Sequence, residues 1–85
     1  MPYVKDTMRE LLNKTLEDAH PTSPGELNYC ITVLIRNYAY RQPLGLSYTR
    51  INDVIGALEG AKLEFYRRVA APYEDTKIEE NGDVY

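Results

Sequence analysis

The sequence predicts an all-α fold, a small helical domain with a long antiparallel helical hairpin plus an N-terminal helix, and we expect it to oligomerise. Three observations predict this fold class. Apolar residues recur at spacings of three and four in three segments. Clusters that contain Pro and Gly separate those segments, and no useful length of chain alternates apolar with polar residues. At 85 residues the chain has the size of one domain, so residues 1–85 are predicted to form a single helical domain.

The first helix is predicted over residues 3 to about 19. Its apolar positions follow helical spacing, and charged residues lie between them: Val4, Met8, Leu11, Leu12, Thr15 and Leu16. His20 precedes Pro21, and a residue before proline avoids the α region, so this pair should end the segment. We expect this helix to pack across the hairpin formed by the other two.

The second helix should begin at Ser23. Ser23 can serve as the N-cap, Pro24 suits the first turn, and Glu26 stands where a capping-box acid would. The breaker cluster Gln42-Pro43-Leu44-Gly45 predicts an end near Arg41. The apolar face of this helix is wide enough to be central to the core, and it comprises Leu27, Ile31, Leu34 and Tyr38, flanked by Cys30, Val33 and Ile35.

A third helix is predicted from residue 48 to Ala71, with Ser47 as its cap. Pro72 either kinks it or starts a new short helix over residues 73–80, and Asn81-Gly82 is a C-terminal stop. A loop of about five residues before this helix forces an antiparallel hairpin. Gly56 and Gly60, four residues apart, would let another helix approach closely, from the same chain or from a second subunit. Because three helices in so short a chain make a marginal core, we expect a homo-oligomer.

Composition narrows the possible chemistry. The net charge is −3, which disfavours binding to duplex nucleic acid. One Cys and one His, Cys30 and His20, exclude an intrachain disulfide and a multi-cysteine zinc site. The sequence has no phosphate-binding glycine loop, no metalloprotease motif and no paired helical carboxylates for Mg²⁺. We therefore expect no enzyme activity, catalytic residue, metal or cofactor, and, since no signal peptide or membrane span is found, a cytoplasmic protein.

The tyrosine and arginine content is the feature of the sequence that points to a ligand. The chain has eight Tyr against one Phe and no Trp, and its basic residues concentrate between residues 36 and 68. Aromatic rings stack on nucleobases and arginine pairs with phosphate, so a small nucleotide-like anion suits this combination. The alternative is that these side chains only line core edges and subunit interfaces. The predicted ligand-binding residues form one cluster at the hairpin tip and a second near Pro72: Tyr40, Arg41, Tyr48, Arg50 and Asn52, then Arg67, Arg68 and Tyr73.

The run from Ser47 to Tyr85 resembles a family of short uncharacterised proteins of phages and bacteria, and the Met1–Val4 start and Leu27-Asn28-Tyr29 are also similar. This resemblance covers 39 residues of the chain closely and implies no particular chemistry. By looser analogy of size, helical character and Tyr/Arg content, the chain is similar to phage anti-defence proteins. These are small helical oligomers that sequester nucleotide immune signals between their subunits.

Three hypotheses about function follow. The leading one is a homo-oligomeric phage-type protein, in the cytoplasm of the bacterial host, that sequesters a small nucleotide-derived immune signal without cleaving it. The signal would be a cyclic oligonucleotide or a cyclic ADP-ribose derivative. Tyrosines 40, 48 and 73 would stack on the ligand, the arginines would neutralise phosphate, and Asn52 would hydrogen-bond a base or sugar. The second hypothesis is a protein–protein interaction module that acts on a host protein. A small helical enzyme of nucleotide metabolism is the third.

Overall fold

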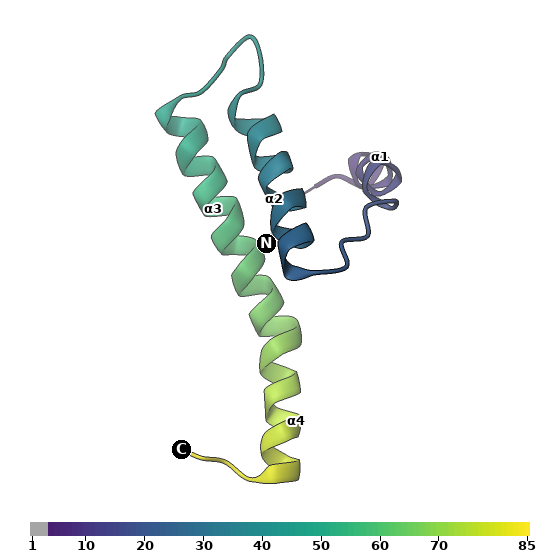
Figure 1. Cartoon of the computed structure of the whole chain (residues 1–85), viewed down its shortest axis with the longest axis vertical. Helices are drawn as coiled ribbons and strands as arrows, with labels where there is room; N and C mark the ends of the chain where they lie inside the picture. Colours follow the sequence, from purple (N-terminus) through teal and green to yellow (C-terminus); the bar gives the residue numbers. More distant parts are fainter. Residues whose placement is uncertain (1–3) are drawn as a thin grey trace. The chain divides into compact units, whose positions relative to one another are not determined.

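A computed structural model describes residues 4–85, and within that range the chain is helical and contains no strand (Figure 1). The all-α prediction is therefore confirmed for this part of the chain. Its compact units are the chain up to Val54 and the segment Ile55–Tyr85, and each is considered by itself. The helices are α1 (Asp6–Leu16), α2 (Pro24–Ala39), α3 (Tyr48–Phe65), the π-helix η1 (Tyr66–Ala70) and α4 (Ala71–Asn81).

Helix α1 is shorter than predicted, ending at Leu16 instead of near residue 19. Glu17 and Asp18 follow directly, and acidic side chains at a helix C-terminus meet the negative end of the helix dipole. The predicted first residue, Tyr3, lies outside the described residues. Within the N-terminal unit, the apolar face of α1 is also exposed: Leu11 is 57% exposed, and its neighbours on this face are similarly open. Helical periodicity marks an apolar face but carries no information about what covers it.

The start of α2 confirms the predicted caps. Ser23 Oγ accepts a hydrogen bond of 3.1 Å from the Glu26 backbone N–H, and Pro24 is in the first turn. In a capping box the Glu26 carboxylate would accept from the backbone N–H of the N-cap residue, Ser23. Here it accepts instead from the preceding residue, Thr22, at 2.9 Å from the backbone N–H and at 2.8 Å from the hydroxyl. These hydrogen bonds, that from the Thr22 backbone above all, lower the pKa of Glu26. The linker before α2 is thereby tied to the helix.

The predicted core face of α2 is not buried. Leu27 is 50% and Leu34 53% exposed, whereas Ala39 is the one buried apolar residue among those described. Half-buried positions flank this stripe, with Cys30 and Val33 on one side and Ile35 on the other. Within the N-terminal unit, the stripe that was predicted to be the core is therefore exposed.

The turn between α2 and α3 is longer than predicted. Helix α2 ends at Ala39, so the loop has eight residues, Tyr40 to Ser47, in place of about five. The Gln42–Pro43 peptide bond is cis, and Gly45 has φ +64°, a conformation that glycine adopts without strain. Ser47 caps α3 as predicted, since its Oγ accepts from the Arg50 backbone N–H at 3.2 Å.

In the C-terminal unit, the chain stays helical through Pro72. Helix α3 ends at Phe65, and the next turn widens into η1, where the Ala71 backbone N–H bonds to the Tyr66 carbonyl, five residues back. Pro72 has no N–H, and its ring would crowd a carbonyl four residues earlier, so a wider turn accommodates it. Helix α4 thus begins at Ala71, before Pro72, where a short helix was predicted to begin at residue 73, and it follows η1 without a break. Gly82, at φ +87°, ends α4 as predicted.

Candidate functional site

Tyr38, Arg50 and Asp53 join the end of α2 to the start of α3. The Tyr38 hydroxyl donates a hydrogen bond of 2.7 Å to Asp53 Oδ2, and the Arg50 guanidinium donates to the Tyr38 backbone carbonyl. The same guanidinium lies 5.1 Å from the centre of the Tyr38 ring, which adds a cation–π contact. The hydrogen bond to Asp53 raises the pKa of Tyr38. Arg50, predicted to bind ligand, is half-buried and holds α2 to α3.

Just beside this junction, an open hollow of about 620 Å³ lies along the last two turns of α2. Val33, Arg36, Asn37 and Tyr40 line it, at the i, i+3, i+4 and i+7 positions of one helix face. Arg36 forms no ion pair or side-chain hydrogen bond within residues 4–85, so its guanidinium is free to meet a ligand. Tyr40 was predicted as a site residue, and Arg36 and Asn37 were not. Arg36 and Asn37 lie four and three residues before Tyr40, and this spacing, which places them on the same helix face, could have identified them from the sequence.

The other predicted tip residues surround the loop without joining one another. Tyr40 is 58% and Tyr48 80% exposed, and Arg41 and Asn52 are also exposed. No side-chain hydrogen bond or ion pair involves Arg41, Tyr48 or Asn52 in the described part of the chain. The tip therefore offers rings and a cation that are open to solvent, without a contact network that orders them.

The second predicted cluster is organised around Glu64. Arg67 donates to the Glu64 carboxylate at 3.0 and 3.1 Å, and Arg68 donates at 3.3 Å. The Glu64 side chain is only 17% exposed, and the hydrogen bond from Arg67 is the largest influence that lowers its pKa. These three side chains carry a net charge of +1, so less positive charge is available here than the sequence predicts.

A hollow of about 450 Å³ adjoins this ion-pair cluster, lined by Gly60, Leu63, Glu64, Tyr66 and Arg67. Tyr73, the last predicted site residue, is 63% exposed, and the Lys77 ammonium lies 5.5 Å from its ring centre. The two predicted clusters fall in different units of the chain. Sequence analysis did not identify Glu64 as the partner of both arginines, although its i+3 and i+4 spacing to them is visible in the sequence.

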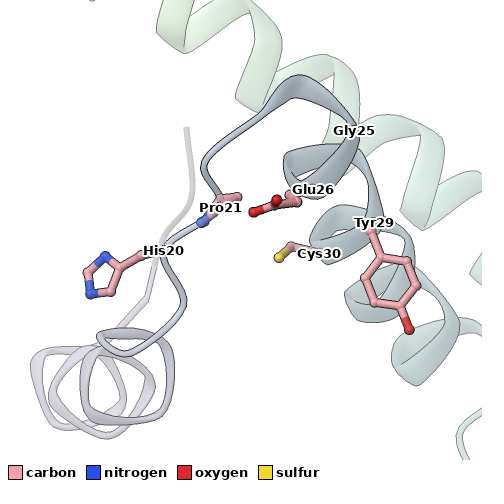
Figure 2. A pocket seen from close by; sticks show the side chains of 6 residues that line it. All are labelled: His20, Pro21, Gly25, Glu26, Tyr29 and Cys30. Atoms are coloured by element: carbon pink, nitrogen blue, oxygen red, sulfur yellow. The ribbon is translucent and has the colours of Figure 1, made fainter.

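A third hollow, of about 340 Å³, lies where the linker meets α2, and Figure 2 shows its six lining residues. The Cys30 sulfur is directed towards the linker, whereas the Tyr29 ring points away from it. His20 is a linker residue, as predicted, and its ring points away from Cys30. No hydrogen bond joins this thiol to a base, and the described residues hold no group of three His, Cys, Asp or Glu side chains that could bind a metal ion.

None of the helices in residues 4–85 has the length and apolar character needed to cross a membrane. Neither a curated protein nor a solved structure matches the sequence. One family model does match, over residues 1–84, and its description is a domain of unknown function, DUF6899. A match over nearly the whole chain is a family-level relationship, so this chain belongs to the DUF6899 family.

Proposed function

We propose that the protein is a homo-oligomeric, phage-type binding protein that captures a small nucleotide-derived signal without cleaving it. The ligand class is a cyclic oligonucleotide or a cyclic ADP-ribose derivative. The single observation that carries this proposal is the hollow on α2, where an unpaired guanidinium, an amide and a tyrosine ring share one helix face. Arg36, Asn37 and Tyr40 supply these three groups.

The chemistry of the hollow suits such a ligand. A guanidinium makes two parallel hydrogen bonds to a phosphate, and an amide can both donate to and accept from a base edge. A tyrosine ring provides a stacking surface for a nucleobase. Arg41 follows Tyr40 in the chain and is exposed, so it adds positive charge next to the hollow. No base–nucleophile pair accompanies these groups, which favours binding over catalysis.

The scarcity of buried apolar side chains in the described residues supports self-association. Ala39 is the only buried apolar residue that the structure describes, and most large apolar side chains are more than one-third exposed. A chain of this size gains stability when copies cover such surfaces. Joined copies would also enclose a hollow that is open in one copy, and a shared site of this kind would retain ligand better.

Native mass spectrometry with a panel of linear and cyclic nucleotides tests the proposal. We expect a discrete oligomer that gains intact nucleotide mass in a fixed ratio to its subunits. Arg36→Gln should abolish that gain, whereas Lys14→Gln removes one cation from an exposed position of α1 that does not line the hollow and should preserve it. An oligomer that gains no nucleotide, or an Arg36→Gln variant that binds as well as wild type, contradicts the proposal.

A protein–protein interaction module is the second candidate. The observation that favours it is the same set of exposed apolar side chains, which a partner such as a host protein could cover instead of a second copy. A monomer that ignores every nucleotide and forms a stoichiometric complex with a purified host protein would favour this candidate over the first.

A further inference from the structure

The hollow on α2 presents its chemical groups in a definite order around the helix. Successive residues of an α-helix are turned by about 100°, so the four lining residues share an arc of about that width. Arg36 lies at one margin of this arc and Asn37 at the other, whereas Tyr40 and Val33 lie between them. A ligand in the hollow therefore meets a guanidinium at one end, an amide at the other and an aromatic ring in between.

The polar groups of the hollow are not engaged by other side chains in residues 4–85. The side chains of Arg36, Asn37 and Tyr40 form no hydrogen bond or ion pair there. The Tyr40 backbone N–H still donates to the Arg36 carbonyl at 3.0 Å, so the ring stays on the helical turn that follows the guanidinium. All of these groups belong to α2 or to its C-cap residue, and a ligand would not have to displace a partner to reach them.

The guanidinium end of the hollow suits a phosphate. Arg36 is the one cation among the described residues that line the hollow. Hydrogen bonds from a guanidinium to phosphate oxygens are roughly twice as strong as hydrogen bonds between neutral groups. A guanidinium also pairs with O6 and N7 of guanine, but that pairing would leave the phosphate of the ligand without a cation. A nucleotide therefore gains most when its phosphate lies at Arg36 and its base extends towards Asn37.

The amide end of the hollow distinguishes between bases. Asparagine makes two hydrogen bonds to adenine, because its carbonyl oxygen accepts from the N6 amino group while its amide nitrogen donates to N7. Guanine presents acceptors at both of these positions, so the asparagine carbonyl would face another acceptor. Stacking on a ring such as that of Tyr40 tolerates every base. Discrimination between bases therefore depends on Asn37.

We propose that the hollow of each subunit takes one adenine nucleotide unit, with the adenine edge on Asn37, the base stacked on Tyr40 and one phosphate on Arg36. This inference rests on the proposed function and narrows its ligand to one that contains adenine. One ring, one amide and one free guanidinium recognise one base and one phosphate, so the binding unit is a single nucleotide.

Isothermal titration calorimetry with AMP, GMP and UMP is the first test. AMP should bind with one molecule per subunit and about fivefold or more tightly than GMP or UMP, since two hydrogen bonds to the correct base discriminate by at least this factor. Asn37→Ala should bring the three dissociation constants to within about twofold of one another. Asn13→Ala removes an exposed amide of α1 that does not line the hollow and should leave the preference unchanged. Both variants place alanine at an exposed helical position, and circular dichroism should show that they keep their helices.

Adenosine, which lacks the phosphate, tests the other end of the hollow. In wild type it should bind about tenfold or more weakly than AMP, whereas in Arg36→Gln the two should bind alike. Equal losses of AMP and adenosine binding in Arg36→Gln would overturn the assignment of the phosphate to this arginine.

The outcomes separate this inference from the proposed function. A protein that binds nucleotides without preferring AMP, or whose preference survives Asn37→Ala, overturns the inference and leaves the proposed function in place. The same holds for a protein that binds a cyclic nucleotide but no mononucleotide. A protein that binds neither mononucleotides nor cyclic nucleotides overturns both.

Discussion

The Tyr38 hydroxyl lies 2.7 Å from Asp53 Oδ2, and this hydrogen bond joins the last turn of α2 to the first turns of α3 across 15 residues. Together with the Arg50 contact to the Tyr38 carbonyl, it connects the two helix ends that flank the loop. The arrangement matters for the proposed site, because the hollow lined by Arg36 and Tyr40 lies on the same two turns of α2.

Tyr38→Phe should lower the thermal stability of the helices at pH 7, because Asp53 loses its donor. The hydrogen bond raises the pKa of Tyr38 above its ordinary value of 10.0, so its stabilisation is fully present below pH 10 and is lost as pH rises through the raised pKa. The difference in Tm between wild type and Tyr38→Phe should therefore shrink by pH 11. A difference in Tm that is the same at pH 7 and pH 11 would contradict this role for the hydroxyl.

Ser23→Ala should destabilise the protein by about 1 kcal/mol, because the Glu26 backbone N–H loses its acceptor at the start of α2. Urea unfolding followed by circular dichroism, at one fixed protein concentration, measures the change. Ser23→Asp keeps an acceptor oxygen at the cap and should stay within a few tenths of a kcal/mol of wild type. Equal losses in the two variants would show that the cap hydrogen bond is not the cause.

Acid should weaken the C-terminal unit through Glu64. Its folded-state pKa lies below the ordinary 4.5, so its stabilisation is present above that value and is lost as pH falls through the lowered pKa. We expect the Tm of wild type to fall between pH 6 and pH 3, and Glu64→Gln to show a smaller fall. Glu79→Gln, which changes a carboxylate that makes no ion pair in residues 4–85, should behave like wild type.

Pro72→Ala should turn η1 into regular α-helix and stabilise the C-terminal unit by up to about 3 kcal/mol, because the segment regains a backbone donor and loses the proline ring. Urea unfolding gives the stability, and amide hydrogen exchange over residues 66–72 shows whether the wide turn has closed. Pro24→Ala is the control, since proline at the first position of a helix carries no such cost. Unchanged exchange in Pro72→Ala would mean that another contact widens the turn.

Most of the helix ends could be predicted because they depend on interactions between residues that are close in sequence. Ser23, Ser47 and Gly82 act through hydrogen bonds or φ preferences within a few residues, and such effects can be read from the sequence. The end of α1 and the length of the loop after Ala39 differed, because helix dipoles and competing turns decide the last few residues. Burial could not be predicted in this way, since the stripe that includes Leu27 and Leu34 was apolar but had no partner within its own unit.

The candidate site shows the same limit. Sequence analysis recognised arginine as the charge carrier, but it could not distinguish a free guanidinium from one already occupied by Glu64 or Tyr38. That distinction depends on side-chain pairing at i+3 and i+4 and across the loop. Arg36, which was not among the predicted ligand-binding residues, is unpaired in the described part of the chain, whereas Arg50, Arg67 and Arg68, which were, have partners.

This pairing predicts a ranking among the arginines for nucleotide binding. Arg36→Gln should weaken binding at least tenfold, since a charge-assisted hydrogen bond contributes about 1.5 to 3 kcal/mol. Arg67→Gln and Arg68→Gln should each weaken it less than about threefold, because their charge is partly neutralised by Glu64 before any ligand arrives. Isothermal titration calorimetry with the nucleotide identified by native mass spectrometry measures all three. If Arg67→Gln or Arg68→Gln costs more than Arg36→Gln, the binding site lies at the Glu64 cluster and the hollow on α2 is not the ligand site.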